Sequence, residues 1–516
     1  MIRICEIKTD ALEKTDALPA KVEKRLHLPA GSVESVCIAK ESTDARQKPN
    51  IYKVYSLDLI TKIKDEEILE RAKALNLKCE KIADEKIDIP KKDFSYRPVV
   101  VGSGPCGLFA ALVLAKAGLR PYVIERGADV ETRIKAVEDF WDGGKLNFKA
   151  NAQFGEGGAG TFSDGKLNTG TKSIYQRFVL EEFVKAGADK EILYKQKPHI
   201  GTDVLRKVIV NIRKEIETLG GEYLFETEFL DFETDRYGVS SVICDKCRLD
   251  TKALILACGH SARDTVRGLF NKGVEMQQKQ FSMGIRIEHS QELIDNAQYG
   301  KVDPKLRKVL GPADYKLNAK LHNGRGIYTF CMCPGGNVVN ASSHEGMVVC
   351  NGMSNFHRDS GKANSAVLVD VRTDDFESES PIAGIAFQEK YERLAFECGG
   401  SNYSLPKENI ASFNSSSSTI KKCLPSFVYD GIVEGLPLLA RKLKGFDSPE
   451  SVLYGIESRS SSPVRITRSE NGLGYMNHEE TEGFYPAGEG AGYAGGIMSA
   501  ACDGIRAAMK LMSKEG

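Results

Sequence analysis

The sequence predicts an α/β protein with three parts: an N-terminal α+β module over residues 1–93, a domain with a parallel sheet from residues 96–267 and 445–516, and an inserted α+β domain over residues 268–444. Three observations predict this organisation. The first 93 residues follow the order βαββαβ. A strand, a glycine turn and a helix begin at Pro98. A long and less regular stretch then separates this pattern from another glycine-rich segment near the C-terminus.

The N-terminal module has complete ferredoxin-like order. Its expected strands and helices are the strands 2–8, 33–39, 52–60 and 78–82 and the helices 20–28 and 65–75. Prolines at positions 90 and 98 indicate a linker over residues 88–97. Because every glycine-rich loop lies after this linker, we expect the module to be a separable accessory unit.

The second part opens with a βαβ unit, which a strand at 121–124 closes. Three segments of the chain match G-x-G-x-x-G, but only Gly102, Gly104 and Gly107 follow an apolar strand and open a helix. Glu125 ends the next strand, where an acidic side chain can accept hydrogen bonds from ribose hydroxyls. The pattern predicts a dinucleotide site in which the pyrophosphate meets the helix N-terminus. The remaining residues of this predicted loop are Ser103, Pro105, Cys106 and, after the second strand, Arg126.

The glycines alone do not decide between NAD and FAD. A second strand, glycine turn and helix start occupies residues 484–497, and a helix is expected over 495–512. Because FAD is long enough to need such a distant second contact, this segment favours FAD. Residues 239–243 and 253–257 are expected to form a hairpin that returns to the parallel sheet.

Several segments together resemble FAD-binding oxidoreductases of the glutathione-reductase and hydroxybenzoate-hydroxylase type, and more closely the uncharacterised FAD-dependent dehydrogenase family. The resemblance covers most of the chain. It is carried by ARQKPNIYKVYSLDL, VVVGSGPCGLFAALVLAKAG, NAQFGEGGAGTFSDGKLNT, TFCMCPGGNVVNASS, SSSPVRI and YPAGEGAGYAGGIMSAACDG.

This resemblance implies an FAD-binding Rossmann-like domain and further cofactor contacts. They are Gly157, Gly158, Ala159, Gly160, Thr161, Gly259, Gly488, Glu489, Gly496 and Ile497. Glu489 stands where related flavoproteins usually have an aspartate that meets the ribityl chain, so its backbone N–H is the alternative contact.

The expected activity is hydride transfer at flavin N5 with a small-molecule substrate in a pocket of the inserted domain. Lys166, Arg459 and His260 are the candidate catalytic residues, since they could orient the substrate or hold charge near the flavin. His289 and His344 are further candidate proton donors, and a surface ion pair is the alternative role of Arg459. A flavin monooxygenase and an FAD-holding RNA-modification or partner-binding factor are the alternative functions. NAD(P)H is expected to bind only transiently, because the sequence contains no second complete nucleotide-binding βαβ unit.

Cysteines at three sites have features of reactive or metal-binding thiols. Cys244 and Cys247 have the spacing of a zinc half-site, but they lie at an expected strand turn, so no metal is predicted. Cys331 and Cys333 are two apart and are expected to share one face of a strand. Cys106 begins a helix whose dipole could lower its pKa, although burial beneath the cofactor is the favoured interpretation.

Charge and composition exclude other classes. Lys plus Arg and Asp plus Glu both number 71, so a nucleic-acid partner is not expected. The longest apolar run, residues 108–115, is far shorter than the ~20 residues of a membrane-spanning helix. Thirteen cysteines and an N-terminus without an apolar signal segment favour reduced thiols and a cytoplasmic protein. The sequence leaves the oligomeric state open.

Overall fold

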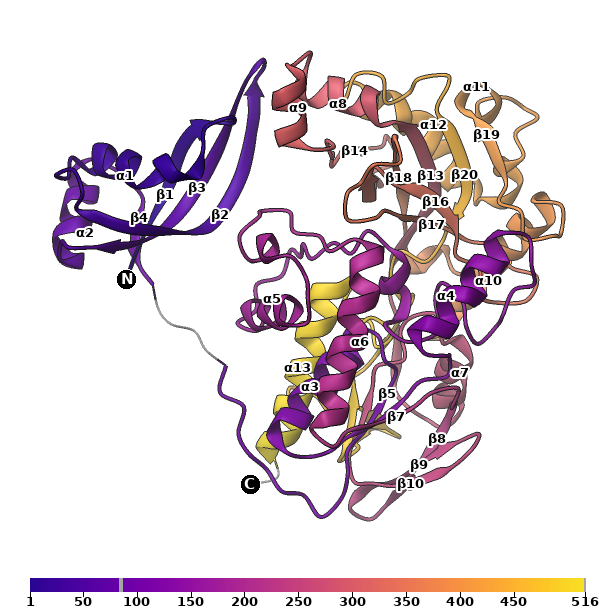
Figure 1. The fold of residues 1–516 in the computed structure, drawn as a ribbon. Coiled ribbons are helices and arrows are strands. Elements are labelled where there is room, and N and C mark those ends of the chain that lie inside the picture. The colour runs from indigo at the N-terminus through magenta and orange to yellow at the C-terminus, as the bar shows by residue number, and fades with distance from the viewer. Residues whose placement is uncertain (83–86, 515–516) are drawn as a thin grey trace.

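The computed structural model describes residues 1–82 and 87–514, and its N-terminal module is a four-stranded antiparallel sheet in the order β2-β3-β1-β4 (Figure 1). Its two helices and its sheet share one apolar core. The elements are β1 (Ile2–Asp10), α1 (Leu18–Leu26), β2 (Val33–Gln47), β3 (Asn50–Thr61), α2 (Asp65–Ala74) and β4 (Cys79–Lys81). This is the expected ferredoxin-like arrangement.

Strand β2 extends eight residues beyond its expected end at residue 39, and β2 and β3 form a long hairpin that reaches the rest of the molecule. The Glu41 backbone N–H donates to Tyr194 O at 2.8 Å, and Lys48 Nζ donates to Ala297 O at 2.5 Å. Residues 40–47 are polar on both sides of the strand, so an alternation of apolar and polar residues could not show its length.

The expected linker at 88–97 lies along the second domain. Lys92 N–H donates to Ala117 O at 3.0 Å, while Phe94 and Tyr96 stack on each other and pack against the core of that domain.

A five-stranded parallel sheet in the order β24-β11-β5-β6-β7 forms the centre of the second domain. Its strands are β5 (Val99–Val101), β6 (Tyr122–Ile124), β7 (Glu222–Leu224), β11 (Leu254–Leu256) and β24 (Phe484–Pro486). Helix α3 (Pro105–Ala117) is buried along almost its whole length between this sheet and the helices α6 (Thr202–Thr218) and α13 (Ile497–Lys514) (Figure 1). The Rossmann-like fold is therefore confirmed, and it joins strands from opposite ends of the chain.

The expected hairpin of residues 239–243 and 253–257 is wrong. β9 (Gly238–Cys244) pairs with β8 (Phe229–Asp235) and β10 (Arg248–Asp250) in a separate antiparallel sheet, whereas β11 enters the parallel sheet. The three residues of β10 are mostly polar and too few to show a strand pattern, so the true partner of β9 was missed.

The inserted part contains a six-stranded sheet in the order β14-β15-β18-β13-β20-β19. Its strands are β13 (Phe281–Ser290), β14 (Asn318–Lys320), β15 (Gly326–Pro334), β18 (Lys362–Val371), β19 (Lys407–Asn409) and β20 (Val452–Glu457). Helices α10 (Ala383–Cys398) and α12 (Ser426–Ala440) contribute to its core. Because β20 pairs with β13, the predicted boundary between residues 444 and 445 divides this sheet. A strand that follows a long loop after α12 gives no sequence signal of which sheet it joins.

The remaining elements connect these sheets. They are α4 (Val130–Trp141), α5 (Gln176–Lys185), α7 (Arg263–Asn271), α8 (Gln291–Tyr299), α9 (Pro304–Leu310), α11 (Ile410–Phe413), β12 (Met276–Gln278), β16 (Asn337–Asn340), β17 (Cys350–Met353), β21 (Val464–Ile466), β22 (Tyr475–Met476) and β23 (Glu479–Glu480). Short 3-10 helices lie at Thr15–Ala17, Gly158–Phe162, Lys190–Leu193, Thr373–Asp375 and Ile420–Cys423.

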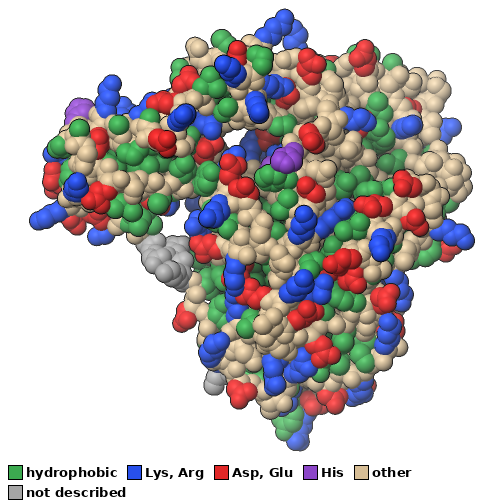
Figure 2. All heavy atoms as spheres, viewed as in Figure 1, with side chains coloured by type: hydrophobic (Ala, Val, Ile, Leu, Met, Phe, Trp, Pro, Cys, Tyr) green, Lys and Arg blue, Asp and Glu red, His purple; other side chains and the backbone are tan. Residues whose placement is uncertain are grey.

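Figure 2 shows acidic and basic side chains interspersed over this face of the molecule. In residues 1–82 and 87–514, no helix combines the length and the apolar character that crossing a membrane requires.

Candidate cofactor and active site

A cavity of about 360 Å³ lies where the carboxyl ends of β5, β6 and β11 meet the inserted sheet. Ligands of open parallel sheets bind at this edge. One side of its wall comes from glycine-rich loops of the second domain, and the other side includes Phe330, Cys331 and residues 349–351. The cavity is therefore shared between the nucleotide-type domain and the inserted domain.

The first glycine loop leaves no room for larger residues. A methyl group on Gly102, whose φ is +99°, would lie 2.3 Å from Ala257 O, and one on Gly107 would lie 1.8 Å from Gly102 O. Gly107 thus packs the helix against the strand and does not line the cavity, whereas residues 102–106 do. A methyl group on Gly104 would meet no atom closer than Gly158 Cα at 3.7 Å, so this position leaves room beside the cavity that it lines.

Glu125 lines the cavity and binds two loops together. Its carboxylate accepts hydrogen bonds from Ser103 N at 3.1 Å, Ser103 Oγ at 2.7 Å, Gly127 N at 2.9 Å and Gly155 N at 3.1 Å. The side chain that was predicted to meet a ribose therefore also fixes the protein groups around that position. Next to it, the Arg126 guanidinium donates to Asp264 at 2.9 Å and lies over the Phe154 ring.

The second glycine loop is held from behind by a fully buried arginine. Arg133 donates to the carbonyl oxygens of Asn151, Gly155, Glu156 and Gly158 at 2.7–3.1 Å. These four carbonyls are thereby held toward the guanidinium. Sequence reasoning missed Arg133, although the signal existed: it lies on the same helix face as the buried Val130 and Val137, where an apolar residue is expected.

This loop only partly follows the prediction. Gly158, Ala159 and Gly160 line the cavity, but Gly157 and Thr161 lie behind its wall. A methyl group on Gly157 would lie 2.2 Å from Thr161 Oγ1, and that hydroxyl donates to Glu156 O at 3.0 Å. Both residues shape the turn and face away from the cavity.

The C-terminal glycine segment lines the cavity beside the first loop, together with Gly259 of the loop after β11. Gly259, Glu489, Gly496 and Ile497 line it, while Gly488 is packed against Cys106 and donates its N–H to Asp503 at 2.8 Å. Helix α13 begins at Ile497, so a second helix N-terminus lies at the wall.

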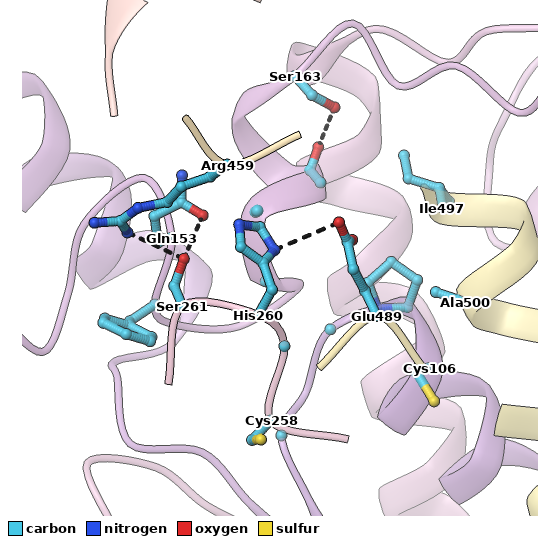
Figure 3. A pocket seen from close by; sticks show the side chains of 18 of the residues that line it. Cys106, Gln153, Ser163, Cys258, His260, Ser261, Arg459, Glu489, Ile497 and Ala500 are labelled. Carbon is cyan, nitrogen blue, oxygen red and sulfur yellow. Dashed lines mark hydrogen bonds and ion pairs between the residues drawn. The ribbon is translucent and has the colours of Figure 1, made fainter. Parts of the chain in front are cut away.

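His260 and Glu489 form a partly buried pair in the cavity wall. His260 Nδ1 lies 3.4 Å from Glu489 Oε1, and Figure 3 shows the ring and the carboxyl facing each other. Burial, together with the nearby Arg459, lowers the pKa of His260 to about 3, and burial raises the pKa of Glu489 to about 7. Among the described residues, none hydrogen-bonds His260 Nε2. The pair therefore holds one exchangeable proton near neutral pH and leaves one ring nitrogen for a ligand.

Arg459 belongs to a buried network, which excludes the alternative of a surface ion pair. Its guanidinium donates to Glu392 at 2.7 Å and to Ser343 Oγ at 2.7 Å. It also donates to Ser261 Oγ at 3.1 Å (Figure 3). Glu392 also accepts a bidentate interaction from Arg263. Sequence reasoning missed Glu392 and Arg263, since no local pattern shows that two residues 129 positions apart form a pair.

The other two histidine candidates lie in different places. His344 contacts Arg459, with its Nδ1 3.2 Å from the guanidinium, whereas His289 is buried against Phe446 O and is not part of the cavity wall.

Lys166 lines the cavity with an ammonium group that makes no hydrogen bond within residues 1–82 and 87–514. Its nearest anion is Asp164, at 3.8 Å. Asp164 is already bound by Arg358 and Ser354, and the Arg358 guanidinium helps to hold the pKa of Asp164 below its ordinary value despite burial. Lys166 is thus the cation of the cavity that is most available to an anionic ligand.

The expected placement of Cys331 and Cys333 on one strand face is wrong. Cys331 lines the cavity, but Cys333 lies behind the wall. The pairing of β15 with β18 is irregular between Phe330 and Cys333, and Cys331 has a left-handed φ of +42°. This bulge breaks the alternation on which the prediction rested.

Cys244, Cys247 and Cys106 lie where the sequence places them, at a strand turn and at the start of a buried helix. Cys244 and Cys247 flank the turn between β9 and β10, with Cys244 N donating to Cys247 O at 2.8 Å, and the described residues contain no group of three or more side chains suited to hold a metal. Cys106 is buried, and burial raises its pKa.

Comparison with known proteins identifies the relatives of this chain. Residues 280–460 match the family "FAD-dependent protein, C-terminal domain-like", residues 96–138 match an FAD binding domain, and residues 1–60 match a domain of unknown function. The chain is 42% identical to an uncharacterised protein of Clostridium beijerinckii over 99% of both chains. It belongs to a family of FAD-dependent oxidoreductases.

The FAD-dependent oxidoreductase is also similar to solved flavoenzyme structures. Glycine oxidase from Bacillus cereus is 11% identical with a TM-score of 0.34, covering 82% of this chain and 96% of that one. L-proline dehydrogenase from P. horikoshii is 13% identical with a TM-score of 0.32, covering 83% and 94%, and halogenase PltM is 10% identical with a TM-score of 0.39, covering 82% and 70%.

The residues of the cavity fit FAD. Gly104 lines the cavity with room beside it, and the N-termini of α3 and α13 lie at the cavity wall. A methyl group on Gly102 or Gly107 would clash within the turn between β5 and α3. FAD is the cofactor of this protein.

Proposed function

We propose that this FAD-dependent oxidoreductase is a dehydrogenase, in which a small organic substrate lies at the inserted-domain side of the cavity and gives a hydride to flavin N5. FAD, when bound, supplies the two-electron acceptor of this reaction. The observation that carries the proposal is the single cavity whose wall combines the glycine loops with Lys166, His260 and Glu489.

Lys166 would orient the substrate. Its ammonium makes no hydrogen bond within the described ranges and lies beside the cavity, so an anionic group such as a carboxylate would give it a partner. Arg459 is held rigidly by Glu392 and two serine hydroxyls, and its side chain is 5% exposed. It therefore contributes a fixed positive field, with most of its hydrogen bonds already made.

His260 and Glu489 would move the proton that accompanies hydride transfer. The imidazole is neutral at pH 7, so Nε2 can accept a proton from a substrate hydroxyl or amine while Nδ1 passes one to Glu489. A pKa of about 7 allows Glu489 to exchange this proton at neutral pH.

The test is anaerobic flavin reduction with a panel of hydroxy acids, amino acids, NADH and NADPH. A dehydrogenase bleaches the flavin with at least one organic substrate, and His260→Asn should slow that bleaching by about two orders of magnitude or more. Gln278→Asn, outside the cavity wall, is the control. Oxygen uptake with a hydroxylated product would instead establish a monooxygenase. A flavin that none of the panel reduces would favour a partner-binding role.

We also propose that the nicotinamide nucleotide binds transiently if it is the reductant. The part of the chain that the structure describes contains one parallel sheet and one set of glycine loops at its edge, and FAD occupies these. A stopped-flow series should accordingly show flavin reduction whose rate rises with NAD(P)H without early saturation.

A further inference from the structure

Five of the cavity-lining and adjacent residues are cysteines, and they divide into two kinds. Cys106, Cys258 and Cys350 line the cavity as single thiols, and burial raises the pKa of each. Cys331 also lines the cavity, but it has Cys333 directly behind it. We propose that Cys331 and Cys333 form a redox-active dithiol on the cavity wall that reduces small disulfide substrates.

The bulge in β15 places the two sulfurs together. In a regular strand, Cys331 and Cys333 would point to the same face as two separate side chains. The left-handed conformation of Cys331 and the break in pairing between Phe330 and Cys333 change this arrangement. Cys331 faces the cavity, and the buried Cys333 thiol lies against the Cys331 sulfur and carbonyl oxygen, the latter at 3.3 Å.

The surroundings favour a thiolate at Cys331. Hydrogen bonding from the Cys333 thiol lowers the pKa of Cys331, and the cations of Lys166 and Arg286 lower it further against the effect of burial. The same contact raises the pKa of Cys333. Arg286 is fully buried, and its guanidinium lies 3.8 Å from Cys333 Sγ while it pairs with Glu457 at 2.6 Å. The pair is thus asymmetric, with an accessible thiolate and a protonated thiol behind it.

This asymmetry suits thiol–disulfide exchange more than other thiol chemistry. A cysteine that attacks a carbonyl carbon needs no second sulfur, whereas a disulfide substrate requires a resolving thiol in contact with the first. The substrate would be small, because the cavity of about 360 Å³ must also admit the cofactor's reactive ring.

The thiol–disulfide exchange proceeds in two steps. The Cys331 thiolate attacks one sulfur of R–S–S–R′, and R′S⁻ leaves with the proton that Cys333 gives up. The Cys333 sulfur then attacks the Cys331 sulfur, RS⁻ leaves, and an intramolecular disulfide remains. Two electrons have passed from the dithiol to the substrate. Two electrons and one proton from reduced flavin restore the thiolate and the thiol, a step that rests on the proposed function.

The first experiment treats the pre-reduced, full-length holoprotein with dithiodipyridine, whose released thione absorbs light. Cys37 is exposed, so every variant carries Cys37→Ser. The parent should release two thiones rapidly, and peptide mass mapping should find a bond between Cys331 and Cys333. Cys333→Ser should release one thione and keep the adduct on Cys331, and Cys331→Ser should lose the fast phase by at least about tenfold.

Cys350→Ser is the matched control, because Cys350 is a buried thiol on the same wall without a second thiol behind it. It should retain the fast release of two thiones. A fast phase that survives Cys331→Ser, or a disulfide that maps to other cysteines, would overturn the dithiol whether or not the protein is a dehydrogenase.

The second experiment is an anaerobic reductive titration of the disulfide form. The parent should take up two more electrons per chain than Cys333→Ser before the flavin is fully reduced. Cys398 and Cys423 are also hydrogen-bonded to each other, and any electrons that they take up are the same in number in both proteins. Equal uptake by the two proteins would show that flavin and disulfide do not exchange electrons, and would overturn the proposed turnover while leaving substrate dehydrogenation intact.

Discussion

The two sides of the cavity are built in different ways. The nucleotide side consists of backbone: Gly102, Gly104 and the loop around Gly158 offer turns and N–H groups whose positions follow from chain geometry. The other side consists of side chains such as Lys166, from a loop of the second domain, and Cys331, from the bulged strand of the inserted domain. The first side is local in sequence, and the second exists only after distant segments have packed.

The two sides therefore differ in the substitutions that they tolerate. The tight turn of the first glycine loop fails when a side chain is added at Gly102 or Gly107, because the space there is already filled. Side-chain sites tolerate changes of shape but fail when a charge or a proton is removed. Substitutions on the two sides should therefore differ in the size of their effects.

Gly107→Val should abolish FAD binding. A Cβ at this position would lie 1.8 Å from the Gly102 carbonyl oxygen, so the helix and the strand cannot keep their spacing. We expect a loss of stability of about 3 kcal/mol or more, and a protein that is purified without bound flavin. Flavin absorbance after purification and thermal unfolding measure both effects.

Gly268→Ala is the control for that variant. Gly268 lies within α7, and an added methyl group would meet no atom within 4 Å. It should keep its flavin and gain up to about 1 kcal/mol of stability, because alanine is the better helix former. A Gly107→Val protein with normal flavin content would contradict the close-packed description of the nucleotide side.

Glu125→Ala should weaken FAD retention at least about tenfold, since charge-assisted hydrogen bonds contribute about 1.5–3 kcal/mol each. The carboxylate has four protein donors, so the substitution releases Ser103, Gly127 and Gly155 together. Equilibrium dialysis against FAD measures the affinity. Unchanged affinity in a folded variant would show that neither the ribose contact nor the loop contact contributes to FAD binding.

Glu489→Gln should alter the pH dependence of stability. The ordinary pKa of a glutamate is 4.5, and burial raises that of Glu489 to about 7 in the folded protein. The neutral carboxyl is therefore favoured by folding, and its contribution to the free energy of unfolding is complete below the unfolded-state pKa and is lost as the pH rises to 7. The decline is at most about 1.4 kcal/mol per pH unit.

Urea unfolding of the FAD-free protein at several pH values measures this decline. Glu489→Gln cannot titrate at this position, so the parent should lose stability relative to the variant between about pH 5 and 7. Parallel curves for the two proteins would mean that Glu489 ionises at its ordinary pKa and that the pair with His260 holds no proton at neutral pH.

The double variant Cys244→Ser and Cys247→Ser should have the smallest effect. These thiols flank a turn between β9 and β10 and are absent from the cavity wall. Flavin content and the rate of flavin reduction should equal those of the parent. Zinc in the parent protein, measured by elemental analysis, would contradict this.

The sequence predicted the nucleotide side because its determinants are neighbours in the chain. A strand, three glycines, a helix and Glu125 occur within about 25 residues, and each has a distinct residue type. Glu392 and Arg263 illustrate the opposite case, because they are 129 positions apart and nothing in either helix marks the pair. The bulge at Cys331 likewise depends on how β15 meets β18, which residues 329–334 alone do not specify.

The predicted Lys166, His260 and Arg459 all reach the cavity wall, yet the prediction gave no indication of their partners. Hydrogen-bond partners set the chemistry of a charged group, and partners arise from tertiary packing. Sequence patterns therefore identified which residues to consider at this site, and the structure was needed to distinguish the available ammonium of Lys166 from the saturated guanidinium of Arg459.

The hairpin of β2 and β3 touches both domains that form the cavity: Glu41 pairs with residues 194–196 of the nucleotide-type domain, and Lys48 reaches Ala297 in the inserted domain. Because the hairpin is hydrogen-bonded to both domains, we expect the N-terminal module to act as a strut that limits their relative motion. Shortening this hairpin would loosen the two domains relative to each other without altering one atom of the cavity wall.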